Sequence, residues 1–315
     1  MTATVDGPAA VTVRSARQVR VLAGDGVRLA CSDYGNRSAC HTVVFLHGWC
    51  LSQLSWSWHA DYLARRHQSA VRVINYDHRG HGRSQSAPAA TYRVDRLADD
   101  LACILDALDV TGKLTLVGHS LGAMVALEYL RRNTRPVNPY GLVLVAAAAG
   151  RLVERGWGRL LAAAGVDGMC RVAEHSPDRL IRGLVGPVCA ALGRRWMRRG
   201  PAQHVGLAEV AASALATTPA ATAAGFLTGL REFDATAVLG SITARTVVVS
   251  GSADALTPVE HSVELADAIP GAVHVCVPGG GHMLAQQVPH MVARAIDHVV
   301  CPEPGLAGDG DRGRS

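Results

Sequence analysis

The sequence predicts an α/β protein built on a mostly parallel, doubly wound sheet with an inserted helical cap. Short β-branched runs alternate along the chain with segments whose apolar residues recur at helical spacing. This alternation is typical of a parallel sheet that helices cover on both faces. It stops near residue 150 and resumes near residue 236, and the stretch between is rich in Ala, Leu and Arg. We therefore expect helices inserted into the sheet pattern there.

Each predicted element follows from its local pattern. The stretch 17–35 reads as a hairpin that turns at 24–26, a Gly-Asp-Gly sequence. The stretch 95–110 has apolar residues at helical spacing, among them Leu97, Leu101 and Ile104. The other expected strands are 42–48, 71–84, 113–120, 141–149, 245–251 and 272–279, and the other expected helices are 121–132, 258–269 and 284–299.

Composition also suggests how the chain is organised. We expect an α/β core from residues 19–149 and 236–300, with residues 150–235 forming the helical cap. Residues 1–18 are expected to be a flexible N-terminus. Residues 301–315 are rich in proline, glycine and charge, which predicts a disordered tail.

Charge and hydropathy exclude several classes of protein. Hydrophobic residues make up 49% of the 315 residues and charged residues 18%, as in a globular protein. The net charge of +5 is modest and every basic residue except Lys113 is arginine, so the sequence does not indicate nucleic-acid binding. No apolar run is long enough to span a membrane, and no signal peptide is visible. The eight cysteines form no C-x-x-C pair. We expect reduced cysteines in a cytoplasmic protein rather than disulfides or a zinc site.

The stretch LVGHSLGA at 116–123 places a serine between two glycines where an apolar strand meets a helix. Gly118, Ser120 and Gly122 have the spacing G-x-S-x-G of a nucleophile elbow. A chain that turns from strand to helix within one residue needs glycine where side chains would collide. The alternative is a small residue at a tight turn, and the rest of the chain must decide between the two.

A serine nucleophile needs a base and a group that orients the base. In a doubly wound sheet the chemistry lies beyond the carboxyl ends of the strands. Asp254 follows the strand at 245–251, and His282 lies in the glycine-rich loop after the strand at 272–279. The chain order Ser, Asp, His is the one expected for this architecture. We therefore predict Ser120, Asp254 and His282 as the catalytic residues.

Two backbone donors are needed for an oxyanion hole. Leu121 directly follows the nucleophile, and Trp49 lies in the loop after the strand at 42–48, so these residues are the expected donors. The alternative for Asp254 is a cap of the helix near Pro258. The histidines that compete with His282 fall within a predicted strand or helix, where packing or surface positions are expected; they are His274, His290 and His298.

Five motifs together carry a family resemblance. They are His47-Gly48-Trp49, DHRGHGRS at 77–84, GHSLG at 118–122, GSADALTP at 251–258 and GGGHM at 279–283. The sequence resembles the α/β-hydrolase fold superfamily, specifically the capped group that includes esterases, lipases, cofactor-free haloperoxidase-like enzymes and epoxide hydrolases. Ser120 departs from the epoxide-hydrolase pattern, in which the elbow carries an aspartate. Acyl chemistry is therefore implied.

Supporting residues are expected around the nucleophile. His47, next to Gly48, is expected to support the oxyanion loop by hydrogen bonding. His119 lies inside the elbow, between Gly118 and Ser120 and near Gly122, and is typical of the family, with no chemical role assigned. The histidines of the 77–84 loop, His78 and His81, resemble a metal pair, but this loop is a family signature. We favour a structural role for them and expect neither a metal nor a cofactor.

The sequence predicts a serine hydrolase that cleaves a carboxylic ester through an acyl-enzyme on Ser120, with lipid esters and thioesters as variants. The expected partner is a small-molecule ester with an apolar acyl group. Perhydrolysis, carbon–carbon bond hydrolysis, acyl transfer and non-enzymatic binding stay open as alternatives. Residues 151–200 carry ten arginines against four acids. Contact with an anionic membrane surface is one interpretation of this charge, but we favour a lid that packs its apolar side on the core.

Overall fold

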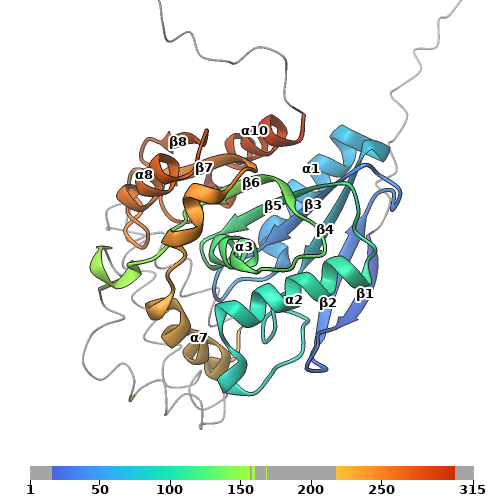
Figure 1. The fold of residues 1–315 in the computed structure, drawn as a ribbon, viewed down its shortest axis with the longest axis horizontal. Coiled ribbons are helices and arrows are strands. Elements are labelled where there is room, and N and C mark those ends of the chain that lie inside the picture. Colours follow the sequence, from blue (N-terminus) through green and yellow to red (C-terminus); the bar gives the residue numbers. More distant parts are fainter. Residues whose placement is uncertain (1–15, 157, 160–167, 169–217, 302–315) are drawn as a thin grey trace, which may run out of the picture.

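The computed structural model describes residues 16–156, 158–159, 168 and 218–301. Figure 1 shows one open sheet with helices on both of its faces. Most of the predicted cap at 150–235 lies outside the described residues, as do residues 1–15 and the predicted tail from residue 302 onward.

An eight-stranded sheet has the strand order β1-β2-β4-β3-β5-β6-β7-β8. Strand β2 pairs antiparallel with β1 and β4, and every other neighbouring pair is parallel. The strands are β1 (Arg17–Leu22), β2 (Arg28–Tyr34), β3 (His41–Leu46), β4 (Val71–Tyr76), β5 (Lys113–His119), β6 (Pro139–Val145), β7 (Arg245–Gly251) and β8 (Val273–Val277). The mostly parallel, doubly wound sheet predicted from the sequence is confirmed.

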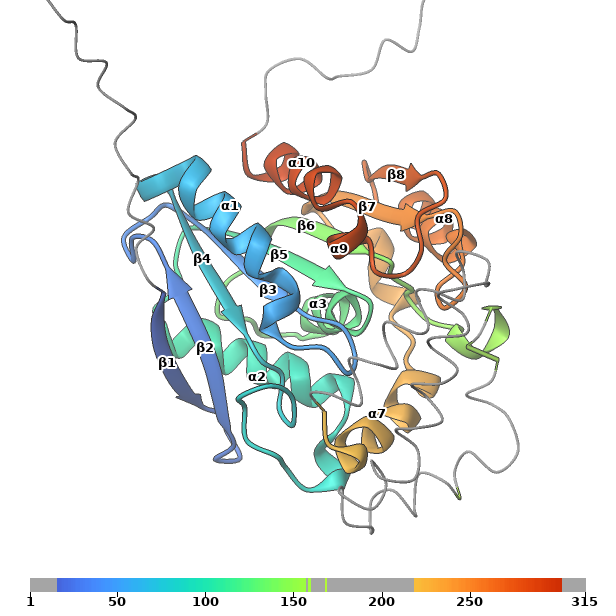
Figure 2. The same cartoon turned by 180° about the vertical axis from the view of Figure 1, so that it is seen from behind.

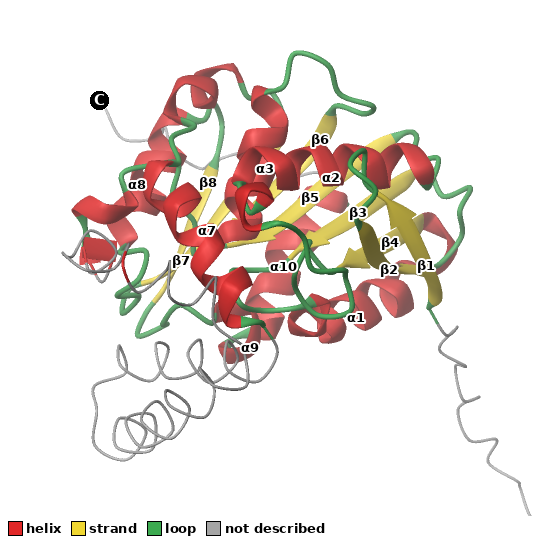
Figure 3. Ribbon diagram, turned by 90° about the horizontal axis from the view of Figure 1, so that it is seen from below, coloured by secondary structure: helices red, strands yellow, loops and turns green. Residues whose placement is uncertain are grey.

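The helices form two layers, one on each face of the sheet. Helices α1 and α10 lie in front of the sheet in Figure 2, and α2, α3 and α8 cover the opposite face (Figure 3). The α-helices are α1 (Ser57–His67), α2 (Val94–Ala107), α3 (Leu121–Arg131), α7 (Ala220–Glu232), α8 (Val259–Ala268), α9 (Leu284–Gln287) and α10 (Pro289–Val300). Short 3-10 helices are η1 (Gln53–Trp56), η2 (Gln68–Ala70), η3 (Ala89–Thr91), η4 (Leu152–Glu154) and η6 (Thr236–Ser241).

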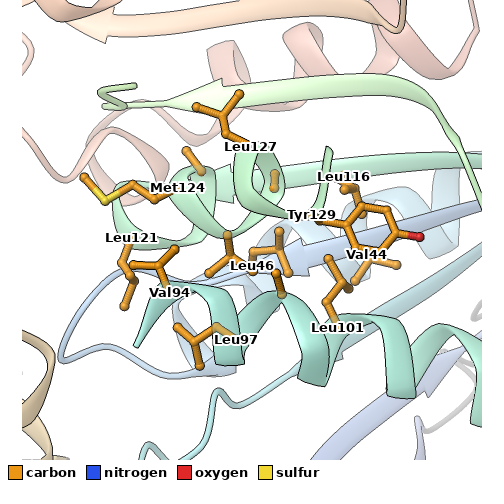
Figure 4. Close-up of a cluster of buried hydrophobic side chains, with 14 of the residues drawn as sticks. Val44, Leu46, Val94, Leu97, Leu101, Leu116, Leu121, Met124, Leu127 and Tyr129 are labelled. Carbon is orange, nitrogen blue, oxygen red and sulfur yellow. The ribbon is translucent and has the colours of Figure 1, made fainter. Parts of the chain in front are cut away.

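The central strands are apolar because both of their faces are covered. All six residues of β3 are buried, and successive side chains enter opposite layers. Val44 and Leu46 pack with α2 and α3 (Figure 4), whereas Val43 and Phe45 pack with α1 and α10. Complete burial of a Val or Leu side chain contributes about 1.5–3 kcal/mol. The continuous apolar run of β3 therefore fixes this strand at the centre of the molecule.

Three elements differ from the sequence prediction. The predicted strand at 71–84 ends at Tyr76, and the residues after it form a loop. The predicted helix at 284–299 divides into α9 and α10, because Pro289 has no backbone N–H and the preceding Val288 is held outside the helical region, at φ −135° and ψ 57°. The pattern analysis also missed α1, which provides the crossover between the parallel strands β3 and β4.

The carboxyl ends of six neighbouring parallel strands meet at one edge of the sheet. They belong to β4, β3, β5, β6, β7 and β8, and the register aligns Leu46 with Gly118 and His119 with Val145. The loops that leave these ends carry the residues predicted to act in catalysis. The candidate site therefore lies at this edge.

Candidate active site

Ser120 occupies the junction between β5 and α3 in a strained backbone conformation. Its φ of 51° and ψ of −113° are unusual for a residue with a side chain. A Cβ on Gly118 would lie 2.5 Å from the Ala123 nitrogen, and one on Gly122 would overlap the Leu46 carbonyl oxygen. The two glycines thus allow the strand, the turn and the helix to pack this closely. The half-buried serine is held at the start of α3.

His282 and Asp254 form a hydrogen-bonded pair at the same edge. His282 Nδ1 lies 2.8 Å from Asp254 Oδ2, and both side chains are buried. Because a carboxylate only accepts, we assign the imidazole proton to Nδ1, which leaves the Nε2 lone pair free to accept a proton. Burial raises the pKa of Asp254, but the charge of His282 and the hydrogen bonds from His282 and Thr257 outweigh it, so that the pKa is lowered overall. Asp254 is therefore ionised and can stabilise an imidazolium.

Thr257 joins this pair, and the sequence analysis missed it. Its hydroxyl donates to Asp254 Oδ2 at 2.8 Å and lies 3.3 Å from His282 Nδ1. The backbone N–H groups of Leu256 and Thr257 donate to Asp254 Oδ1 at 2.9 and 3.0 Å. The signal in the sequence is a hydroxyl residue three positions after the acid, which a tight turn can fold back onto the carboxylate.

His119 connects the candidate nucleophile with the candidate base, because it precedes Ser120 in the chain and contacts His282. His119 Nε2 lies 2.9 Å from the His282 carbonyl oxygen, and the two rings are 4.9 Å apart. Burial lowers the pKa of His119 to about 3, so this ring is neutral and donates to that carbonyl. Among the described residues, no hydrogen bond joins the Ser120 hydroxyl to His282. Catalytic hydrogen bonds of this kind often tighten only when substrate binds.

The two predicted oxyanion donors are Trp49, in the loop after β3, and Leu121, the first residue of α3. Within the described part of the chain, neither the Trp49 nor the Leu121 backbone N–H has a hydrogen-bond acceptor. His47 supports this loop, because its Nδ1 lies 2.8 Å from the Gly48 carbonyl and its Nε2 accepts the His78 N–H at 2.9 Å. The loop also packs tightly on the elbow, since a Cβ on Gly48 would lie 2.6 Å from His119 Nδ1.

The sequence of the chain matches a known protein family. A family model described as "alpha/beta hydrolase fold" matches residues 41–285. This range includes the loop after β3, the elbow at 118–122, Asp254 and His282. The chain belongs to the α/β-hydrolase fold family. The resemblance identified from the five sequence motifs is therefore confirmed.

Relatives of this α/β hydrolase carry several enzyme names. A non-heme chloroperoxidase from Streptomyces lividans is 34% identical over 134 residues, which are 42% of this chain and 46% of the relative. A bifunctional esterase/perhydrolase, DCH from Acinetobacter calcoaceticus, is 35% identical over 112 residues, 36% of this chain and 38% of the relative. The matched part of the chain spans less than half the length of either relative.

The similarity to solved structures covers more of the chain than the similarity to these sequence relatives does. A thermophilic esterase from Thermogutta terrifontis superimposes with a TM-score of 0.68 at 25% identity, and the match covers 90% of this chain and 97% of the esterase. The α/β hydrolase described here is thus similar to an esterase over most of its fold.

Three of the four ring nitrogens of His78 and His81 in this α/β hydrolase form hydrogen bonds within the described part of the chain. His81 Nδ1 donates to the Arg79 carbonyl at 3.0 Å, and its Nε2 accepts the Cys50 N–H at 3.2 Å. His78 Nε2 donates to the His47 carbonyl at 3.1 Å. Burial lowers the pKa of His81 to about 3 and that of His78 well below its ordinary value, so both rings are neutral. These contacts support the structural role that we favoured for the pair.

The described residues show neither a metal-binding cluster nor a membrane-spanning helix. No group of three or more His, Cys, Asp or Glu side chains in this part of the chain is placed to hold a metal ion. None of the described helices combines the length and the apolar character that a membrane span requires. The arginine-rich stretch at 151–200 lies almost entirely outside the described residues.

Proposed function

We propose that the protein is a serine hydrolase that cleaves a small-molecule carboxylic ester through an acyl-enzyme on Ser120. One observation carries the proposal: a serine on a strained strand-to-helix turn and a buried, hydrogen-bonded His282–Asp254 pair lie at the same carboxyl edge of the sheet, where His119, the residue before the serine, contacts the His282 carbonyl. Nucleophile, base and orienting acid are the groups that acyl transfer needs. The similarity to esterases supports the choice of substrate class.

In the proposed reaction Ser120 Oγ attacks the ester carbonyl while His282 Nε2 takes the serine proton. The ionised Asp254 stabilises the imidazolium that forms, and the N–H groups of Trp49 and Leu121 donate to the oxyanion. The carbon–oxygen bond to the alcohol then breaks, and the alcohol leaves with the proton from His282. Water attacks the acyl-enzyme by the same route in reverse and releases the acid and the free serine.

Perhydrolysis is the second candidate, and the names of the chloroperoxidase and perhydrolase relatives favour it. It shares the first half of the ester reaction. Hydrogen peroxide then replaces water, attacks the acyl-enzyme and releases a peracid, while His282 again handles the proton. The two candidates thus differ only in the second nucleophile, and the same variants test the acyl-enzyme in both.

We further propose an apolar acyl group on the substrate and a cytoplasmic location. The described cysteines are all free thiols, which fits a reducing compartment. A series of p-nitrophenyl esters of increasing chain length measures the acyl preference, and the ratio of peracid to acid at fixed peroxide separates the two reactions.

Labelling with a fluorophosphonate probe tests the nucleophile. We expect the probe to attach to the peptide that contains Ser120, and Ser120→Ala to lose both the label and the ester activity, by about 10⁴-fold or more in kcat. Ser241 is a matched control, because its residue is exposed and, among the described residues, its hydroxyl bonds only to the Val238 carbonyl. Ser241→Ala should keep the label and the activity. A folded Ser120→Ala protein that retains most of its esterase activity would contradict the proposal.

A further inference from the structure

A second constellation of nucleophile, base and acid lies where α1 and α10 end. Cys301 follows the last residue of α10, and His67 is the last residue of α1. Cys301 Sγ lies 3.7 Å from His67 Nδ1, and His67 Nε2 lies 2.8 Å from Asp297 Oδ1. A thiol, an imidazole and a carboxylate therefore form a continuous hydrogen-bonded chain.

The carboxylate determines which nitrogen of His67 can act as a base. Asp297 also accepts hydrogen bonds from the Tyr62 hydroxyl at 2.8 Å and pairs with Arg66 at 3.0 Å. Burial raises the pKa of Asp297, but the hydrogen bonds from His67 and Tyr62 and the charge of Arg66 outweigh it and lower the pKa overall. An ionised Asp297 only accepts, so the His67 proton lies on Nε2 and the Nδ1 lone pair faces the thiol.

This cluster is remote from the proposed active site. Helices that connect parallel strands run back along the sheet, so the C-terminal ends of α1 and α10 lie at the edge opposite to the tip of β5 (Figure 2). Cys301 is exposed, whereas the side chains of His67 and Asp297 are 11% and 16% exposed. A reagent from solution can therefore reach the sulfur while the base and the acid stay held.

Two other cysteines allow a comparison within the molecule. Cys40 and Cys276 are also exposed, and neither has a histidine within hydrogen-bond reach among the described residues. Accessibility alone would make all three thiols similarly reactive. If Cys301 reacts faster than Cys40 and Cys276, the difference is therefore attributed to its contact with His67.

We propose that Cys301, His67 and Asp297 form a thiol-exchange site that takes a low-molecular-weight disulfide. His67 Nδ1 accepts the thiol proton as the Cys301 sulfur attacks one sulfur of the disulfide. The sulfur–sulfur bond of the reagent breaks, a mixed disulfide forms on Cys301, and the released thiolate takes the proton from His67. Because Cys301 lies at a helix C-terminus, where the partial charge is negative, the step depends on a base in contact with the thiol.

The reaction is measured on the intact protein with glutathione disulfide as the probe. Short incubations at pH 7.5 are followed by peptide mapping, which gives a separate rate of mixed-disulfide formation for each cysteine. We expect Cys301 to react roughly tenfold faster than Cys40 and Cys276, because only Cys301 has a general base. In urea the three rates should become similar, since unfolding separates the base from the thiol.

His67→Gln tests the base, because glutamine can still donate to Asp297 but does not take up a proton at this pH. The Cys301 rate should fall to that of Cys40, and Asp297→Asn should lower it in the same direction. His290→Gln, which replaces an exposed histidine of α10, is the matched control and should leave the rate unchanged. Equal rates for the three thiols in the folded wild type, or an unchanged rate in a folded His67→Gln protein, would overturn the proposal. Either result leaves the assignment of Ser120 untouched.

Discussion

The carboxylate of Asp254 accepts four hydrogen bonds, and three of them come from its own turn. Oδ1 takes the N–H groups of Leu256 and Thr257, and Oδ2 takes the Thr257 hydroxyl together with His282 Nδ1. Four donors stabilise the ionised form and prevent rotation of the carboxylate. Thr257 is therefore a positioning residue in the proposed reaction: it acts through Asp254 and does not meet the substrate.

Thr257→Val should lower kcat with little change in KM. Valine has the shape of threonine but cannot donate to Oδ2, so the carboxylate is less firmly oriented against the imidazolium. A hydrogen bond to a charged group contributes about 1.5–3 kcal/mol, which corresponds to a loss of roughly tenfold or more in kcat. Thr257→Ser restores the hydroxyl and should restore most of the rate. Steady-state kinetics on one ester measures both constants.

A purely structural role for Thr257 predicts different results for the two variants. The thermal midpoint would then fall in both variants in proportion to the lost methyl or hydroxyl packing, and kcat would not separate serine from valine. Equal kcat values for Thr257→Val and the wild type would show that the hydroxyl does not act through Asp254.

The sequence located Asp254 and His282 because each follows an apolar strand, and parallel strands bring their carboxyl ends to one edge. It could not reveal Thr257, since the contact of its hydroxyl depends on the dihedral angles of the 254–257 turn. The turn also packs against a segment that is distant in sequence: a Cβ on Gly156 would press against the Ala255 carbonyl and the Pro258 ring. The close packing of Gly156 on this turn cannot be predicted from the residue types alone.

At the scale of elements, the oxyanion loop is held by parts of the chain that are distant in sequence. His81 accepts the N–H of Cys50, a residue with a φ of 58°, and the Trp49 indole donates to the Ala223 carbonyl of α7 at 3.2 Å. The His81 ring in turn contacts Phe226 of α7 at 5.5 Å between centroids. The position of the Trp49 N–H thus depends on the 77–84 loop and on α7 together.

His81→Leu should therefore reduce kcat by about tenfold or more, because loss of one oxyanion donor costs 10²–10³-fold and a displaced donor costs part of that. KM should change little, since the lost interaction forms only in the transition state. His41→Leu is the matched control: it also removes a buried neutral histidine, but one at the amino end of β3. The control should lower the thermal midpoint and leave kcat near wild type. Similar kcat values in both variants would contradict the role of His81.

The elements that the sequence predicted well are those with a strong period. The apolar residues Leu97, Leu101 and Ile104 of α2 are all fully buried. Helix α1 was missed because its sequence, SWHADYLARRH, has few aliphatic residues, and its buried face is made instead by residues such as His59, Ala60 and Leu63. Tertiary packing against the sheet, rather than local propensity, determines that helix.

At the scale of the whole molecule, buried neutral histidines link stability to pH. Burial lowers the pKa of His41, His47 and His59 to about 4, whereas an unfolded histidine titrates near 6.5. The unfolded chain therefore binds more protons than the folded chain below pH 6.5. The contribution of these histidines to the free energy of unfolding is therefore fully present above that pH, and it is lost as the pH drops toward 4. Unfolded carboxylates titrate mostly below pH 5, so the window from 6.5 to 5 reports the histidines.

His59 provides the test of this linkage, because it is not one of the proposed catalytic groups and its ring contacts Phe45, Trp56 and Trp58. Phenylalanine fits the same aromatic surroundings and cannot bind a proton. His59→Phe should therefore flatten the pH dependence of the unfolding free energy by up to about 1.4 kcal/mol per pH unit between pH 6.5 and 5. Urea unfolding at four or five pH values gives this slope. An unchanged slope in His59→Phe would mean that His59 does not contribute to acid unfolding.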